Sequence, residues 1–488
     1  MAAILLPLGA VWSASDGLVR PRPEDWSAIW FTLYQASLSA LLSVGLAVPV
    51  ARALFRRRFW GRNALILIMG APFILPVIVA VLGLIAVFGQ NGILNSLLGA
   101  LGVKTVSIYG IQGILLAHVF FNLPLATRMI LTGWSGIPAE RLRLGQSLGL
   151  GPLASFRMIE APMLRRVVPS ALAIIFVICL SSFAVALTLG GGPRATTLEL
   201  AIYQAVRFDF DLGTAASLGV IQLVLAGSAA VALAVIGVRT DFGRGLDRSL
   251  ATVGDPMWRR VLDTVWILCA AGFLILPLGM VVSQGFLGLA ALGPEVWTAA
   301  ARSVMMALAS TVLCLGLALG LMHKWGEVVG TLGISVSPLV LGVGVFLIIR
   351  QVANPFDYAL YVTLCVNAVM ALPFVVRILR PAAEDTRILY GPLAMSLEIT
   401  GWAWVRWILL PRLARPLGFC AGLVAALAMG DLGVIALFGT AEHATLPLKL
   451  YQLMGAYRMD QAAAAACLLV CLSLGLFWVF DRIGRRYA

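Results

Sequence analysis

The chain has 488 residues, of which 61% are hydrophobic and only 12% are charged. A soluble domain needs a more polar surface than this, so the composition excludes one and indicates a protein surrounded by lipid. Its net charge of +13 comes mostly from arginine in short segments between apolar runs, a distribution typical of a membrane topology signal, and we expect no nucleic acid as a partner.

Apolar runs long enough to cross a hydrocarbon core of about 30 Å recur along the whole chain. Residues 1–14 are apolar but short; we predict a first helix or an interfacial segment there, since no basic stretch precedes them as in a signal peptide. The sequence thus predicts an all-α membrane protein with about twelve membrane-spanning helices. Eleven are clear, at residues 28–52, 63–88, 112–133, 167–190, 214–238, 259–284, 299–322, 330–350, 358–380, 415–438 and 461–481.

Arginines cluster between alternate predicted spans. They follow the first and third spans, separate the two halves, fill the late loop 386–415 and end the chain. By the positive-inside rule these segments face the cytoplasm. The segments 89–111, 191–213 and 439–460 contain few basic residues, and we expect them on the periplasmic side.

An internal repeat divides the chain. Leu123, Pro124 and Arg128 recur 249 residues later as Leu372, Pro373 and Arg377, and TLELAIYQ (197–204) recurs as TLPLKLYQ (445–452). The repeat predicts two homologous modules, residues 1–238 and 261–488, joined by a cytoplasmic linker at 239–260. Both modules cross the membrane in the same sense, which favours a pseudo-axis along the membrane normal and a central pathway between them.

Each predicted module contains an amphipathic cytoplasmic loop, at residues 138–166 and 386–415. A short helix, a turn and a second helix with apolar side chains suit a groove on a partner protein. A basic segment on anionic lipid is the alternative, but it does not explain a repeated spacing. The repeated positions are Ser147, Leu148, Gly149, Ile159 and Pro162 in the first copy and Ser396, Leu397, Glu398, Ile408 and Pro411 in the second.

This spacing resembles the EAA loop of ABC importer permeases, although Glu398 replaces the usual glycine. Three further segments, RALFRRRFWGR (52–62), GILLAHVFFNLPLATR (113–128) and GDLGVIALFGTAEHATLPLKLYQ (430–452), extend the resemblance to thiamine-importer permeases with two fused type I modules. The resemblance implies that two copies of a cytoplasmic ABC ATPase dock on the loops and that a periplasmic thiamine-binding protein delivers substrate. It also implies a location in the bacterial inner membrane.

The chain lacks a nucleotide site of its own. A P-loop needs a Gly-Lys pair, and none of the three lysines, Lys104, Lys324 and Lys449, follows a glycine. We therefore expect a transport subunit rather than an enzyme, with ATP and Mg²⁺ bound only by the partner ATPase. The seven cysteines and three histidines show no ligand spacing, so we expect no metal site.

Three polar residues inside predicted spans are candidates for the pathway. Asp431 is expected either to favour a cationic substrate, or to cap a broken helix or pair with a neighbouring arginine. Asn122 and Asn367 are expected either to contact substrate or to bond neighbouring helices. The predicted substrate is thiamine or its phosphates, with ferric iron as the alternative. Mixed charges in the periplasmic segments suit a transient contact with a binding protein: Arg194, Glu199, Asp209, Asp211, Glu442 and Lys449.

Overall fold

The structure is a computed structural model, and it describes residues 2–15, 22–70, 72, 74–192, 195–235, 256–322, 336–440 and 442–486. Every regular element in these ranges is a helix, which confirms the all-α prediction. Most of the predicted linker, 239–260, lies outside the described residues, so the division of the chain into two modules stays a prediction. We use "first half" for residues 1–238 and "second half" for residues 261–488, together with the helix that leads into the latter.

In chain order, the helices of the first half are α1 (Ala2–Ala14), α2 (Pro23–Arg56), α3 (Arg62–Ile68), α4 (Val77–Phe88), α5 (Ile93–Ala100), α6 (Ile111–Ser135), α7 (Ala139–Ser147), α8 (Pro152–Ser155), η2 (Phe156–Glu160), α9 (Ala161–Leu180), α10 (Phe183–Leu189), α11 (Leu198–Arg207) and α12 (Leu212–Val235).

Those of the second half are α13 (Met257–Gly288), η4 (Leu289–Ala291), α14 (Pro294–Gly320), α16 (Pro338–Ile349), η5 (Pro355–Tyr358), α17 (Ala359–Ser396), α18 (Gly401–Trp404), η6 (Val405–Leu409), α19 (Leu410–Met429), α20 (Gly433–Phe438), α21 (Leu446–Gly455) and α22 (Met459–Arg486). The element order repeats the first half, and both ends of α9 and α19 are 249 residues apart.

Ten helical stretches among the described residues are long and apolar enough to cross a membrane. Two shorter apolar helices, α1 and α16, fall below that length. The prediction of a multi-pass membrane protein is therefore confirmed. The predicted span 330–350 contains α16, which begins after the Ser337 cap and has only 12 residues, so ten stretches rather than eleven meet the criterion.

Three predicted spans are interrupted. The span 63–88 divides into α3 and α4 across a segment that contains Pro72 and Pro76, and proline lacks the amide that a continuous helix needs. The spans 167–190 and 415–438 end one helix and begin another at Ser181–Ser182 and Gly430–Leu432. The span 358–380, by contrast, is only the start of α17, which continues unbroken to Ser396.

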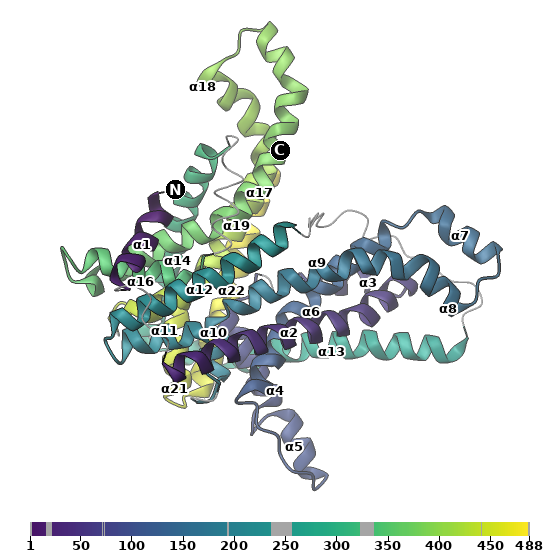
Figure 1. Ribbon diagram of the computed structural model, residues 1–488, viewed down its shortest axis with the longest axis horizontal. Coiled ribbons are helices and arrows are strands. Elements are labelled where there is room, and N and C mark those ends of the chain that lie inside the picture. The colour runs from purple at the N-terminus through teal and green to yellow at the C-terminus, as the bar shows by residue number, and fades with distance from the viewer. Residues whose placement is uncertain are drawn as a thin grey trace.

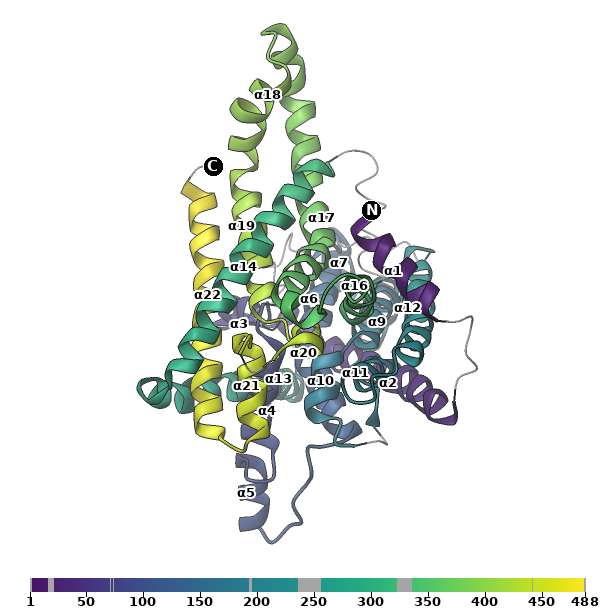
Figure 2. The ribbon, with the colours of Figure 1, turned by 90° about the vertical axis from the view of Figure 1, so that its left-hand side faces the viewer.

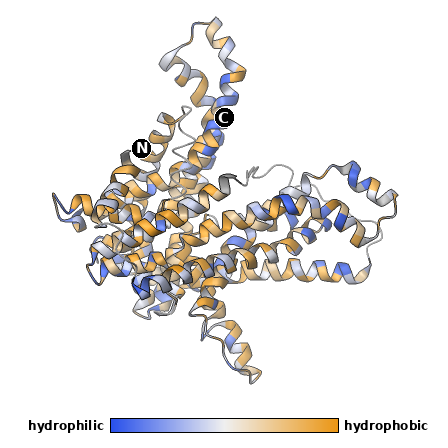
Figure 3. Ribbon diagram, in the orientation of Figure 1, coloured by the Kyte–Doolittle hydropathy of each residue, from blue (hydrophilic) through white to orange (hydrophobic). Residues whose placement is uncertain are grey.

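The helices form two arms that diverge from a shared base (Figure 1). One arm ends in α7 and α8, and the other ends in α18 and the last turns of α17, as the turned view also shows (Figure 2). The base contains α10, α11 and α21. Hydrophilic residues gather near the arm ends and at the base, whereas the long helices between them are mostly hydrophobic, as expected for a chain in lipid (Figure 3).

The first helix of each half packs against the other half. α1 lies on α16, and α13 lies on α4. Both contacts are backbone-close: a Cβ on Gly344 would collide with the Pro7 carbonyl group, and one on Gly83 would collide with the Pro277 carbonyl group. Small residues allow helix backbones to approach this closely in a membrane. The two halves are thus interlocked in the same way at two equivalent places.

Candidate docking loops and transport pathway

The first predicted docking loop is a helical hook at the end of one arm (Figure 1). α7 ends at Ser147, Leu148 follows, and Gly149 turns the chain toward α8 and the π-helical η2. Ser147, Leu148 and Gly149 are exposed, and Ile159 is half-buried. Pro162 lies in the first turn of α9, which continues directly from the π-helical η2.

The second loop has the same plan at the end of the other arm. Ser396 ends α17, Leu397 caps it, and Glu398 turns the chain toward α18 and the π-helical η6. These three residues are exposed, Ile408 is half-buried, and Pro411 begins α19 as Pro162 begins α9. The structure therefore brings each predicted set of five residues together on one hook, while their contact with an ATPase stays a prediction.

The turn in each loop has a left-handed backbone, with φ of +62° at Gly149 and +53° at Glu398. In both turns the next amide donates back to a carbonyl group five residues earlier, which is how a Schellman cap closes a helix. The two bonds run from Leu150 N to Gly145 O (3.0 Å) and from Ile399 N to Ala394 O (2.9 Å). The cap explains why glycine suits this position and why Glu398 holds it only under strain.

Both hooks expose large apolar side chains to their surroundings. Water-exposed apolar surface of this extent is typical of a protein contact. The exposed residues are Leu144, Leu148, Leu153 and Met158 on the first hook and Leu393, Met395, Leu397 and Trp402 on the second.

An ion-pair cluster that sequence reasoning missed holds the first loop to its arm. The buried Glu160 carboxylate in η2 lies 2.7 Å from Arg52 Nε and 3.3 Å from Arg56 Nη2, both at the end of α2. Arg52 also covers the Phe156 ring. The corresponding position in the second loop, 249 residues later, is Leu409. A carboxylate within an arginine-rich loop was the available signal for this cluster, but the charges of the loop had been used only to predict the membrane topology.

A second ion pair connects the two halves near the same end of α2. Arg57 Nη2 lies 2.6 Å from Asp263 Oδ2, and the Asp263 side chain on α13 is largely buried. Because α13 belongs to the second half, this contact links the arm of the first loop to the other half.

Asp431 and Asn367 come together where α19 and α20 are separated. Asp431 Oδ1 accepts a hydrogen bond from Gly433 N (3.1 Å), and the Asn367 side chain on α17 faces the carboxylate. Within the described residues, neither Asp431 Oδ2 nor Asn367 Nδ2 has a hydrogen-bond partner of good geometry. Asp431 thus caps a broken helix and keeps one carboxylate oxygen available, so both of its predicted roles stay open.

Asn122 lies apart from this pair. Its Nδ2 donates to Cys179 Sγ on α9 at 3.3 Å, and its side chain is buried. The structure therefore supports the interpretation of Asn122 as a bond between helices rather than a substrate contact.

His118, to which the sequence assigned no role, makes two close polar contacts in the first half. Its Nδ1 lies 2.8 Å from Ser39 Oγ on α2, and its Nε2 lies 2.7 Å from Ser182 Oγ in the break between α9 and α10. Both partners are more than sixty positions away in sequence, so a lone histidine gave no local signal. The sequence indicated only that His118 and Asn367 occupy equivalent positions of the repeat, because they are 249 residues apart.

Two polar contacts join the halves at the base. Ser337 Oγ, at the start of α16, donates to Glu199 Oε1 on α11 at 2.5 Å, and Arg207 Nη2 donates to Gly439 O at 3.3 Å. Burial raises the pKa of the Glu199 carboxyl group to about 7, although the Ser337 hydrogen bond limits the rise. Glu199 is 1% exposed, so its predicted role on a docking surface is wrong. Arg194 lies outside the described residues.

Comparison with known proteins places these features in a family. No family model matches the chain. It is 38% identical to the thiamine transport system permease protein of Escherichia coli, over 95% of this chain and 92% of that protein. It is 39% identical to the protein of the same name from Brucella abortus, over 99% of this chain and 92% of that protein.

A more distant relative covers only part of the chain. A probable sulfate transport system permease protein of Helicosporidium is 28% identical over 48% of this chain and 88% of that protein. The two full-length similarities exceed what unrelated chains share, and they cover both loops and the residues between them. The chain therefore belongs to the family of thiamine transport system permease proteins.

Proposed function

We propose that this chain is the membrane pathway of an ATP-driven importer that moves thiamine or its phosphates from the periplasm to the cytoplasm. The observation that carries the proposal is the family membership, which extends over nearly the whole chain. A bacterial inner-membrane location follows from the same membership and from the arginine-rich segments expected to face the cytoplasm.

Two copies of a cytoplasmic ABC ATPase dock on the two hooks, one on each. Support comes from the matched helix caps at Gly149 and Glu398 and from the exposed apolar side chains beside them. A periplasmic binding protein delivers substrate to the opposite side, near the base. This chain contributes the pathway, and the ATPase subunits bind ATP and Mg²⁺.

The transport cycle follows from the arrangement of the arms. The hooks lie at the ends of separate arms, so ATP-driven closure of two ATPase subunits would draw the arms together (Figure 1). Because the arms share a base, drawing their ends together changes the strain on the contacts between halves there. ATP can drive this change only by stabilising the closed-arm state more than the open one.

Uptake by reconstituted complex tests the function. The chain, its ATPase and its binding protein are placed in proteoliposomes, and uptake of labelled thiamine, thiamine pyrophosphate and ferric iron is measured with and without ATP. We expect ATP-dependent thiamine accumulation. The ferric-iron alternative has no observation in its favour, and ATP-dependent accumulation of iron without thiamine would overturn the proposal.

Cross-linking tests the docking sites. Single cysteines at Ser147 and Ser396 are paired with cysteines in the ATPase cleft. The control is an exposed position on α5, which projects away from both hooks (Figure 1). We expect cross-links from Ser147 and Ser396 and none from α5. An assembled, active complex in which neither serine position reacts would remove the docking sites while leaving the transport function intact.

A further inference from the structure

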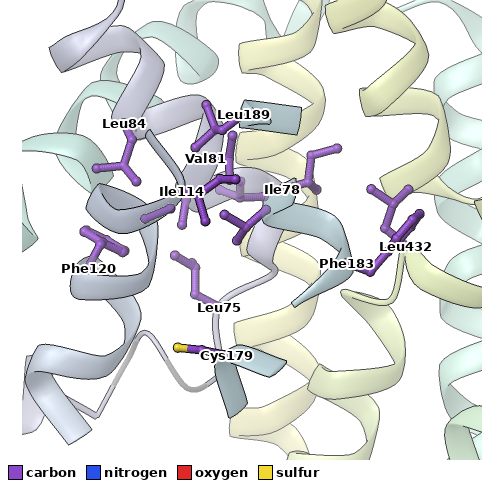
Figure 4. Packing of buried hydrophobic residues seen from close by; sticks show 14 of the residues in the cluster. Leu75, Ile78, Val81, Leu84, Ile114, Phe120, Cys179, Phe183, Leu189 and Leu432 are labelled. Atoms are coloured by element: carbon purple, nitrogen blue, oxygen red, sulfur yellow. The ribbon is translucent and has the colours of Figure 1, made fainter. Parts of the chain in front are cut away.

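Two equivalent residues of the repeat meet where the halves contact each other. Phe183 begins α10 and Leu432 precedes α20, and they are 249 residues apart. A Cβ on Gly433 would lie 3.9 Å from Phe183 Cδ1, and Figure 4 shows Phe183 beside Leu432. Both side chains are buried. Equivalent positions of a two-fold repeat touch only close to its axis, so this apolar pair lies on the axis between the halves.

Equivalent polar pairs flank this contact. Ser182 precedes Phe183 and holds His118 Nε2, whereas Asp431 precedes Leu432 and faces Asn367. His118 and Asn367, like Ser182 and Asp431, are 249 residues apart. The repeat has therefore kept a polar pair on each side of the axis and changed its chemistry, with a carboxylate in the second half only.

The depth of the contact follows from helix length. α9 and α19 contain 20 residues each, or about 30 Å of helix, between the hooks and the two breaks. The first turns of both helices belong to the cytoplasmic loops 138–166 and 386–415, so the breaks lie within the apolar spans 167–190 and 415–438, on the side away from the hooks. The contacts from Glu199 to Ser337 and from Arg207 to Gly439 also join the halves on the side away from the hooks.

We propose that Phe183 and Leu432 form the closed outer constriction of the pathway, and that the pairs His118–Ser182 and Asn367–Asp431 are the polar groups that a cationic substrate meets on passing it. This inference rests on the proposed transport function. An apolar constriction blocks charged and hydrated solutes because it excludes water. Polar groups are retained at this depth only where they serve a path or a partner.

The two sides offer different chemistry to one ligand. Asp431 Oδ2, which has no partner of good geometry among the described residues, can attract a positive charge. Both ring nitrogens of His118 already contact serine hydroxyl groups, so the group of this pair with hydrogen-bonding capacity to spare is the uncharged Ser182 hydroxyl. The constriction therefore suits an elongated ligand with a cationic part and a neutral polar part, and it disfavours solutes that carry only negative charge.

A leak assay without ATP tests the constriction. Phe183→Ala and Leu432→Ala, singly and together, are compared in proteoliposomes for passive entry of choline. The matched control pair is Leu189→Ala and Phe438→Ala, which are also 249 residues apart and fully buried, but Phe438 packs within its own half against Phe346. The milder pair Phe183→Leu and Leu432→Val covers the case in which the alanine variants fail to assemble.

We expect choline entry through the Phe183 and Leu432 variants and a tight membrane with the control pair. Equal tightness of all assembled variants, or an equal leak from the control pair, would overturn the constriction. Because the assay uses neither thiamine nor ATP, its failure would leave the proposed importer function untouched, and failure of thiamine uptake would leave the leak result standing.

Charge selection tests the polar pairs. In the Leu432→Ala background, passive entry of choline is compared with that of isethionate, an organic anion of similar size. We expect a preference for choline that Asp431→Asn removes and His118→Asn keeps. A preference that survives Asp431→Asn, or none at all, would overturn the role of Asp431 beside the constriction.

Discussion

The left-handed turn at Gly149 and Glu398 gives a matched pair of substitutions with opposite expected signs. At φ near +60°, a residue with a side chain costs about 1–2 kcal/mol relative to glycine. Glycine also increases the conformational entropy of the unfolded chain, and this offsets about 0.4–1 kcal/mol of the gain from relieved strain. We therefore expect Glu398→Gly to stabilise the second cap by about 1 kcal/mol net, and Gly149→Ala to destabilise the first cap by a similar amount.

The two substitutions isolate backbone strain. Among the residues that the structure describes, no atom lies within 4 Å of a Cβ built on Gly149, so alanine there meets no crowding from them. Hydrogen exchange of the cap amides reports the local stability, and about 1 kcal/mol corresponds to about a fivefold change in exchange rate. Leu150 N should exchange faster in Gly149→Ala, and Ile399 N slower in Glu398→Gly. Unchanged rates at both amides would refute the assignment of the loop turns as strained caps.

Three further predictions concern contacts between elements. Glu160→Gln removes the charged partner of Arg52 and Arg56 and should destabilise the first loop by about 2 kcal/mol, a value that already allows for the partial exposure of Arg52. Thermal unfolding of the complex measures this loss, and an unchanged unfolding transition would contradict it. Asp263→Asn should similarly loosen α13 from α2 and raise hydrogen exchange in α13, whereas unaltered exchange there would count against the Arg57 pair. The raised pKa of Glu199 means that the folded state binds a proton more tightly than the unfolded state, so its contribution to stability is present below about pH 4.5 and is lost as the pH rises through about 7. Glu199→Gln should flatten this part of the stability profile, and an identical pH dependence in the variant would contradict the burial of Glu199.

Sequence patterns predicted those features that depend on neighbours along the chain. Apolar length identified the membrane-spanning helices, and the offset of 249 residues identified both hooks and the equivalence of Gly149 with Glu398. The breaks near Pro72 and Pro76 also have a local cause in proline. The continuation of α17 from the membrane span into the second loop has no such local cause, because packing maintains this helix through three prolines.

Contacts between distant segments could not be predicted in this way. His118 gains its role from Ser39 and Ser182, and Glu160 gains its role from α2, more than a hundred positions away. Glu199 lies in a segment whose mixed charge suggested a contact with a binding protein, yet the approach of α16 buries it. The Glu199 contact depends on how the two halves interlock, and the other two depend on how distant helices pack within the first half; no local sequence pattern records either.

The distance between the two hooks tests the central claim most directly. Spin labels at Ser147 and Ser396, in a complex assembled with the ATPase in lipid nanodiscs, report this distance by pulsed electron paramagnetic resonance. We predict that binding of ATP, with hydrolysis blocked, shortens the distance and that release of nucleotide restores it. A distance that stays the same in both states, in a complex that still transports thiamine, would contradict the account of the hooks as the points at which ATP moves the pathway.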